Sequence, residues 1–326
     1  MRIIPIVTVA VVLLSGCVSI PTGNIDAFGV AASDVTNKID AVISDYNKAN
    51  INDKLVAMAQ YNKKYVKSDM DPIKKVIIRD SDKKNFALYK ANHALGSYAK
   101  SLSALANAGS REELALAGVK LSKSLKGMND QYKTLKETQN DLISDENSGK
   151  IGRVIAELAT YYVEYKRGKA LKEIIIAADP SIQTIGKIIN DQLLKGVIEG
   201  RLYTMRGNEL AGYFSDYNSQ ANKLSFAKKK KLLDDIYEKY IAMESTTATV
   251  VQAQKAIASV MKAHAELRAE LEKDHFNSRR ITKALENIKT VHNSFDDLEE
   301  LIKTCETEII SDDEKGIICK GADTSN

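Results

Sequence analysis

Residues 225–274 read SFAKKKKLLDDIYEKYIAMESTTATVVQAQKAIASVMKAHAELRAELEKD, and they carry the clearest structural signal in the chain. Its apolar and β-branched residues recur every three or four positions with no proline between them, which is typical of a helix that packs against another helix along one stripe. The stripe consists of Leu233, Ile236, Tyr240, Met243, Thr247, Val250, Gln254, Ile257 and Met261, and Val260, His264, Leu267 and Leu271 continue it after a one-residue shift. A continuous helix over this stretch would be about 75 Å long.

The same helical spacing extends over most of the remaining chain. Apolar residues from Ile281 to Ile302 predict a return helix after a turn at Asn277 and Ser278. Further helices are expected over 25–48, 55–66, 81–105, 110–143 and 151–178, and from Pro180 onward, with either a break or an exposed patch at 49–53. Ser110 and Glu113 have the spacing of a capping box. Asp179-Pro180 predicts a helix start with proline at the first helical position.

These patterns favour an all-α fold. Almost no stretch alternates with period two, and the chain has only four prolines to interrupt its helices. We expect an elongated antiparallel helical bundle of about seven helices, some of them long and coiled-coil-like. The bundle is predicted to be one domain over residues 25–305, followed by a polar C-terminal tail over residues 306–326. Gly196 and Gly200 share a helix face, where a neighbouring helix is expected to approach closely.

The beginning of the chain has a different character. Arg2 is the only charge before residue 26, and residues 3–14 are apolar except for Thr8. This run of about twelve residues has the length of a secretory leader and is too short to span a bilayer. Leu14, Ser15 and Gly16 then precede Cys17.

This order resembles the lipobox of bacterial lipoproteins, which places a leucine and two small residues before the modified cysteine. The resemblance covers the first seventeen residues and implies that residues 1–16 are a signal peptide, cleaved between Gly16 and Cys17. It also implies that Cys17 is acylated and that residues 17–24 form a lipidated tether. Position 18 is Val rather than the Asp of inner-membrane lipoproteins, which favours the outer membrane. An ordinary signal peptide with a chance cysteine and a buried apolar helix are the alternatives.

Composition and cysteine usage agree with an exported protein. The chain has 47 Lys+Arg and 43 Asp+Glu, and removal of residues 1–16 takes away one Arg, so the near balance argues against nucleic acid as a partner. With Cys17 assigned to lipid, Cys305 and Cys319 remain, and an even pair in an exported chain predicts a disulfide. It would close a loop of about 15 residues and contribute about 3 kcal/mol. Two free thiols are the alternative.

Catalytic motifs are scarce. The four histidines form no HExxH motif, no CxxC motif occurs, and nothing in the pattern predicts a metal site or another cofactor. Ser97–Lys100, Ser225–Lys228 and Ser259–Lys262 match Ser-x-x-Lys without the partner motifs of penicillin-recognising enzymes. His264 and His292 lie on the helical seams, and we predict hydrogen-bonded core histidines there, with a ligand role as the alternative. The pattern therefore favours a protein that is not an enzyme.

Two segments are candidates for surface contacts. Lys228–Lys231 begins a helix, where positive charge opposes the helix dipole, and we interpret it as a solvated face balanced by Asp234 and Asp235. Contact with lipid headgroups or an anionic glycan is the alternative. The apolar stripe Ile182, Ile185, Ile189, Leu193 and Val197 is expected to pack inside the bundle, although it has the spacing of a membrane-surface helix as well.

Three functional hypotheses follow. The first is a lipid-anchored helical interaction scaffold or exclusion module at the bacterial cell envelope, with an envelope protein as its partner. The second is a membrane-active protein of the α-helical toxin type that inserts the glycine-rich segment after Pro180. The third is a cell-wall-associated enzyme, for which the sequence offers no motif.

Overall fold

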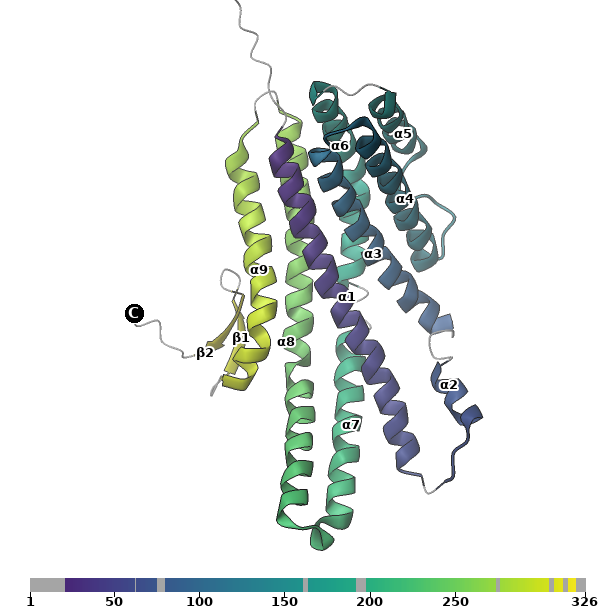
Figure 1. Ribbon diagram of the computed structural model, residues 1–326, viewed down its shortest axis with the longest axis vertical. Coiled ribbons are helices and arrows are strands. Elements are labelled where there is room, and N and C mark those ends of the chain that lie inside the picture. The colour runs from purple at the N-terminus through teal and green to yellow at the C-terminus, as the bar shows by residue number, and fades with distance from the viewer. Residues whose placement is uncertain are drawn as a thin grey trace, which may run out of the picture.

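The computed structural model describes residues 21–61, 63–74, 80–160, 164–191, 198–273, 276–304, 308–312 and 316–320. Its helices lie side by side in an elongated bundle, which confirms the predicted all-α architecture (Figure 1). The helices are α1 (Thr22–Ala59), α2 (Asp71–Lys74), α3 (Asp80–Asn107), α4 (Arg111–Lys136), α5 (Asp145–Thr160), α6 (Glu164–Ile188), α7 (Glu199–Gln220), α8 (Phe226–Leu271) and α9 (Ser278–Thr304). Short 3-10 turns, η1 (Lys67–Met70) and η4 (Ala221–Lys223), lie in two connections.

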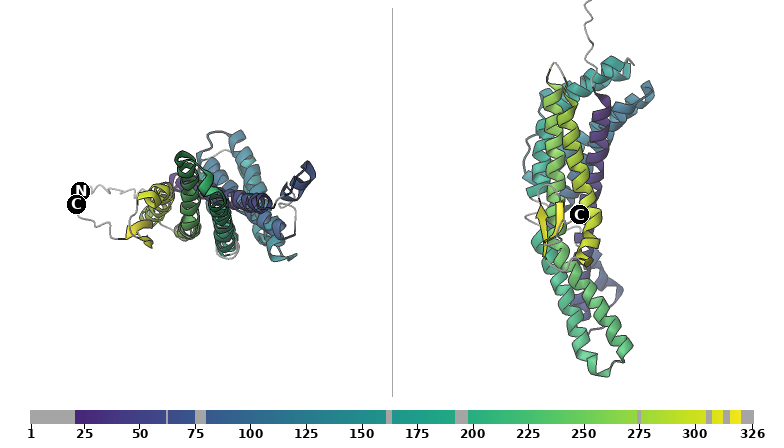
Figure 2. Two further views of the ribbon diagram at one scale, coloured as in Figure 1. Left: turned by 90° about the horizontal axis from the view of Figure 1, so that it is seen from below. Right: turned by 90° about the vertical axis from the view of Figure 1, so that its left-hand side faces the viewer.

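Helix α8 is the central element of the bundle. It is continuous over 46 residues with Ser225 at its N-cap position, as the sequence predicts, and it packs against α1, α6, α7 and α9. Its seam is buried from Val250 to Leu271. The prediction of one buried seam is wrong on the N-terminal side of Val250, because Leu233 and Tyr240 are exposed there. There α7 and α8 form a two-helix hairpin that extends beyond the other helices (Figure 2), and two helices alone cannot cover both sides of each other.

Helix α1 differs from the expected pair of helices. It runs unbroken through residues 49–53, where the sequence predicts either an interruption or an exposed patch, so there is no interruption. Ala49 is buried, Asn52 donates a hydrogen bond to the Glu209 carboxylate at 3.4 Å, and Asp53 accepts one from Asn208 at 2.9 Å. These contacts with α7 give the polar residues partners without breaking the helix. The helix also begins at Thr22, so the last residues of the predicted tether over 17–24 are helical.

Glycine lets α1 and α3 approach closely. A Cβ atom on Gly29 would lie 2.5 Å from the Ala99 carbonyl oxygen and 2.7 Å from Ser103 Cβ in α3. Such separations are much shorter than van der Waals contact, so only hydrogen fits at position 29. Phe28 and Ala32, on either side of Gly29, are buried and belong to one continuous core. The close helix contact predicted at Gly200 is wrong, because no atom lies within 4 Å of a Cβ there; Gly196 lies outside the described ranges.

The N-terminus of α4 has the predicted cap. The Ser110 hydroxyl accepts the Glu113 N–H at 3.2 Å, and the Glu113 carboxylate reaches back to the Gly109 N–H at 2.7 Å. The helix ends at Lys136 rather than Ile143, because Glu137 adopts a left-handed conformation with φ of 52°. This conformation reverses the chain, and the buried Ile143 then packs from the following loop.

Helix α6 continues through Pro180, so the predicted helix start at Asp179-Pro180 is wrong. A proline inside a helix lacks an N–H donor and ordinarily costs about 3 kcal/mol. The residues around it are firmly packed, since Ile182, Ile185 and Ile189 are fully buried, and the prediction that this apolar stripe packs inside the bundle is confirmed for them. Leu193 and Val197 of the same stripe fall in a range that the structure leaves undescribed.

The C-terminal tail contains a β-hairpin that the sequence analysis did not predict. Strand β1 (Glu308–Asp312) pairs antiparallel with β2 (Gly316–Lys320), with Ile309 opposite Cys319 and Ile310 opposite Ile318. Two pairs of consecutive isoleucines supply the β-branched residues that strands favour, but five residues are too few for a clear alternating pattern. Strand β2 contacts α9.

Candidate functional site

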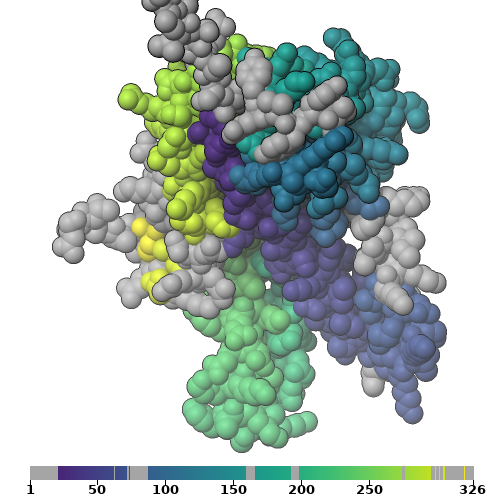
Figure 3. Space-filling model, turned by 45° about the horizontal axis from the view of Figure 1, so that its top comes forward, coloured from purple at the N-terminus to yellow at the C-terminus, as the bar shows by residue number. Residues whose placement is uncertain are grey.

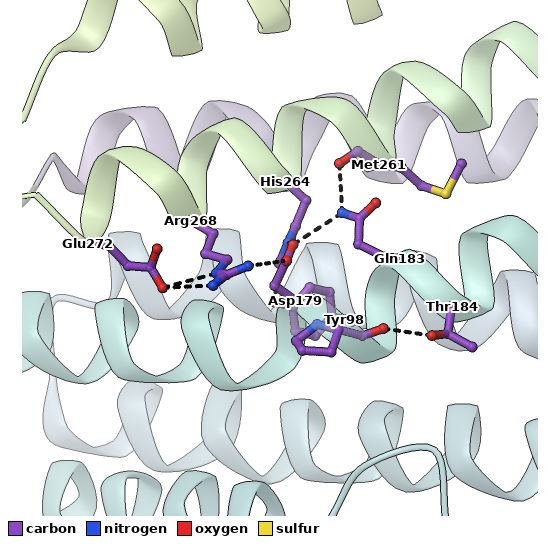
Figure 4. A network of polar contacts seen from close by, with 9 residues as sticks. Tyr98, Asp179, Gln183, Thr184, Met261, His264, Arg268 and Glu272 are labelled. Carbon is purple, nitrogen blue, oxygen red and sulfur yellow. Dashed lines mark hydrogen bonds and ion pairs between the residues drawn. The ribbon is translucent and has the colours of Figure 1, made fainter.

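A polar cluster lies in the core where α1, α3, α6 and α8 meet. The Tyr98 hydroxyl is 2.9 Å from His264 Nε2, and His264 Nδ1 is 2.7 Å from the Asp179 carboxylate (Figure 4). Phe28 of α1 makes an edge contact with the imidazole at 5.4 Å between ring centroids. All of these side chains are almost completely buried. The prediction that His264 is a hydrogen-bonded core histidine is therefore confirmed.

The charge states of the cluster follow from burial and from its contacts. Burial raises the pKa of Tyr98 well above its ordinary value, and the Asp179 charge raises it further. Burial would also raise the pKa of Asp179. Hydrogen bonds from His264 and Gln183, together with the nearby positive charge of Arg268, nevertheless hold that pKa below its ordinary value. A protonated Tyr98 can donate to Nε2 while Nδ1–H donates to the carboxylate, which satisfies each group.

Asp179 has further partners toward the surface. Gln183 donates to the carboxylate at 3.1 Å and to the Met261 carbonyl at 2.9 Å. Arg268 lies 3.4 Å from the other carboxylate oxygen and binds Glu272 at 3.0 Å (Figure 4). The cluster thus joins α3 and α6 to α8, and His264 is completely buried. This geometry suits hydrogen bonds that hold the three helices together. Sequence reasoning missed Asp179, whose partner in α8 is 85 residues away.

An apolar groove lies between α1 and α9 at the end of the bundle where α1 begins. It has a volume of about 650 Å³ and is lined by residues 23–34 of α1 and 282–293 of α9. His292 is one of the lining residues, and its Nδ1 is buried without a hydrogen-bond partner in the described part of the chain. The prediction of a hydrogen-bonded core histidine is therefore wrong for His292, because its side chain is only half-buried and its Nδ1 has no partner among the described residues.

A second cleft separates the end of α1 from the α7–α8 hairpin. It has a volume of about 870 Å³, and the two lobes beside it stand apart in the space-filling view (Figure 3). Lys239 lies on its wall, 2.8 Å from the Glu209 carboxylate and 5.5 Å from the Tyr213 ring centroid. Burial would lower the pKa of Lys239, but Glu209 raises it above the ordinary value. The lysine therefore stays charged and is held by α7.

The lower half of α8 carries an exposed apolar stripe. Four large side chains share one helix face, at spacings of seven, four and three residues, and we name them the α8 stripe: Phe226 (83% exposed), Leu233 (43%), Tyr237 (61%) and Tyr240 (43%). Ile236, which lies at the edge of this face between Leu233 and Tyr240, is buried. Exposed apolar side chains are ordinary when isolated, but a row of four on one helix is typical of an interaction surface. The α8 stripe is the strongest candidate for a binding site.

The predicted charged and covalent sites have different outcomes. The lysines of Lys228–Lys231 are solvated, and Lys230 binds Asp234 at 2.7 Å, as expected for a balanced surface. Gly16, Cys17 and Cys305 are outside the residues that the structure describes. Cys319 lies in β2. The lipid attachment and the disulfide therefore stay predictions.

The described ranges contain no group of three His, Cys, Asp or Glu side chains arranged to hold a metal ion. Over the same ranges, no helix combines the length and the apolar character needed to cross a bilayer. Comparison of the chain with protein family models, with characterised proteins and with solved structures gives no match.

Proposed function

We propose that the protein is a lipoprotein anchored to the bacterial cell envelope, in the outer membrane, through acylated Cys17. We propose that its helical bundle is an interaction scaffold or exclusion module for an envelope protein. The single observation that carries the proposal is the position of α1. The helix begins at Thr22, so the residues between Cys17 and the bundle reach about 17 Å at most.

This short connection would hold one end of the bundle at the lipid surface. The beginning of α1 and the turn between α8 and α9 lie at the same end, whereas the turn between α7 and α8 lies at the opposite end (Figure 1). The α8 stripe is close to that opposite turn. An anchor at one end and an exposed apolar surface at the other suit a protein that presents a binding surface at a distance from its membrane.

Binding rather than catalysis is favoured by the geometry of the buried cluster. Tyr98, His264 and Asp179 are the described side chains that most resemble a catalytic arrangement, and burial closes them to a substrate. We also propose the Cys305–Cys319 disulfide, which is supported by the contact between α9, whose last residue is Thr304, and β2, which holds Cys319.

Mass spectrometry of the native protein tests the anchor. We expect a mature chain that begins at Cys17 and carries acyl groups, together with recovery in the outer-membrane fraction. The control is the Cys17→Ser variant, which we expect to lack acyl groups and to lose the membrane association. An unmodified Cys17 with residues 1–16 still attached would refute the proposal.

A photocrosslinking amino acid at position 237 in the α8 stripe tests the interaction role. We expect a reproducible crosslinked product in intact cells. The matched control carries the same amino acid at position 116 in α4, where Leu116 is 57% exposed and lies away from the stripe. Equal crosslinking at both positions, or none at either, would count against an interaction role of this surface. Release of fragments from peptidoglycan by the purified chain would instead favour an enzyme.

A further inference from the structure

We propose that the apolar groove between α1 and α9 holds an acyl chain carried by Cys17 of the same molecule. We call it the α1–α9 groove, and its lining comes from residues 23–34 and 282–293. The inference rests on the proposed function, because it requires an acylated Cys17, and it gives the lipid a second place besides the membrane. Three observations carry it: the chemistry of the groove, its dimensions and its distance from the cysteine.

Small side chains on α1 leave the space that forms the groove. Gly23, Ala27 and Ala31 recur every four residues, so they lie on one helix face, and all three line the groove. Helices α1 and α9 run in the same direction from the same end of the bundle (Figure 1) and pack against each other. Hydrogen or a methyl group cannot fill the space between two helices, so an open channel remains beside their contact.

The larger side chains that line the groove make much of its surface apolar. Val30 is 51% exposed, Leu285 is half-buried, and Ile288 is fully buried. Glu286 and Lys289 line the groove as well and are exposed to solvent. Water against such apolar side chains is unfavourable, and a hydrocarbon that replaces it is stabilised. The groove is therefore suited to a ligand whose bound part is hydrocarbon.

The dimensions of the groove suit an acyl chain better than a helix. Its lining extends from Gly23 to Asp34 of α1, which is about 17 Å of helix. The volume of about 650 Å³ then corresponds to a mean cross-section of about 40 Å², whereas a helix about 10 Å across needs about 80 Å². A row of methylene groups is about 4 Å wide. An acyl chain that spans one leaflet is about 15 Å long and matches the length of the groove.

The lipid would be attached close to this groove. Cys17 precedes Gly23, the first lining residue, by six residues, so at most about 20 Å of chain joins them. A short tether of this kind gives the attached group an effective concentration in the millimolar range. A phospholipid chain has no such tether and would have to leave the bilayer unaided. The acyl chain on Cys17 of the same molecule is therefore the favoured occupant.

An acyl chain in the groove makes the anchor reversible. The lipobox resemblance implies more than one acyl chain on Cys17. Two or more chains anchor a protein stably, whereas a single chain binds a bilayer only marginally. When the α1–α9 groove holds one chain, fewer remain in the bilayer, and the protein can pass from one membrane to another. The groove then keeps hydrocarbon out of water during the passage.

Photocrosslinking of the lipid locates it. Cells are grown on a fatty acid that carries a diazirine near its methyl end, and the acylated chain is purified, irradiated and digested from the monomer band of a denaturing gel. We expect adducts on the peptides that contain Val30 and Leu285. Val30→Asp is expected to lose most of them, whereas Val119→Asp, at an equally exposed valine of α4, should keep them. Adducts confined to phospholipid, to another protein or to a second copy would overturn the proposal.

The Cys17→Ser variant separates the two sources of hydrocarbon. It is grown on the same fatty acid and has no acyl chain of its own, so label in the groove could come only from phospholipid. We expect no adducts on the groove peptides of this variant. Adducts at the level of the acylated chain would show that the groove takes up phospholipid and would refute the tethered chain as its occupant.

Transfer between vesicles tests the consequence for the anchor. The acylated chain is incorporated into phosphatidylethanolamine and phosphatidylglycerol vesicles, and its passage to acceptor vesicles is followed by flotation. Each methylene group kept out of water changes the partition about fourfold, so Ala27→Phe, which fills the groove, is expected to slow the transfer by at least about tenfold. Ala156→Phe, at an exposed position of α5, is the matched control. Equal rates, with both variants folded by circular dichroism, would contradict the proposal.

Mass spectrometry of the same preparations keeps the two proposals apart. An unmodified Cys17 refutes the lipid anchor and the occupant of the groove together. An acylated Cys17 without adducts in the groove leaves the anchor intact and refutes only the inference drawn from the groove.

Discussion

Replacement of Gly29 by alanine tests how closely α1 packs against α3. The new methyl group would lie 2.5 Å from the Ala99 carbonyl oxygen and 2.7 Å from Ser103 Cβ. The oxygen belongs to the α3 backbone and cannot rotate away, so the two helices must separate. Overpacking of this kind costs about 1–3 kcal/mol. Alanine regains about 1 kcal/mol through its higher helix propensity, so the upper part of that range leaves a net loss of about 1–2 kcal/mol.

Gly152 provides the matched control, because it lies in α5 with no atom within 4 Å of a Cβ. The same substitution there adds only helix propensity and is expected to stabilise the protein by about 0.5–1 kcal/mol. The two variants should therefore differ in sign. Urea denaturation followed by circular dichroism measures both free energies of unfolding. A Gly29→Ala variant as stable as the Gly152→Ala variant would refute the argument that the α1–α3 distance requires glycine.

Three further outcomes are expected. Tyr98→Phe leaves the buried His264 Nε2 without its partner and should destabilise the protein by about 1–3 kcal/mol in the same denaturation assay, whereas Tyr203→Phe, at an exposed position, should change little. The pKa of Asp179 is below its ordinary value, so its contribution to stability is present above that ordinary value and is lost as the pH falls through the lowered pKa; an Asp179→Asn variant should show a smaller loss of stability on acidification. Ser110→Ala removes the N-cap of α4 and should cost about 1 kcal/mol, measured by thermal melting, and an unchanged melting temperature would contradict the role of the cap.

Local sequence signals predicted several elements correctly. The three-and-four spacing of apolar residues predicts α8 and α9, and the serine–glutamate pair predicts the start of α4, because both signals depend on neighbours within one or two helical turns. The same local signals failed at Pro180, and at residues 49–53 they could not decide between a break and an exposed patch. In both places the sequence contains residues that commonly end helices, whereas packing and hydrogen bonds from distant segments keep the helix intact.

The candidate sites also divide into those that a local pattern predicts and those that depend on residues far apart in the chain. The lipobox and the two later cysteines are local patterns, so the sequence alone predicts an anchor and a disulfide. The sequence also places His264 on a seam, but its bonds to Tyr98 and Asp179 join residues 166 and 85 positions apart. The α8 stripe could not be separated from the buried seam by its spacing, since both have the same residue types and the same period.

The amino-acid sequence alone establishes that this chain is helical, that its longest helix runs from Ser225 past Leu267, and which faces of the helices are apolar. These properties follow from backbone hydrogen bonding and from the period of the side chains along one helix. Which part of each apolar face is covered depends on the packing of the helices in three dimensions. Burial depends on how many helices surround a given level of the bundle: several surround the upper half of α8, whereas mainly α7 accompanies the lower half, and Phe226 and Tyr237 are left in solvent.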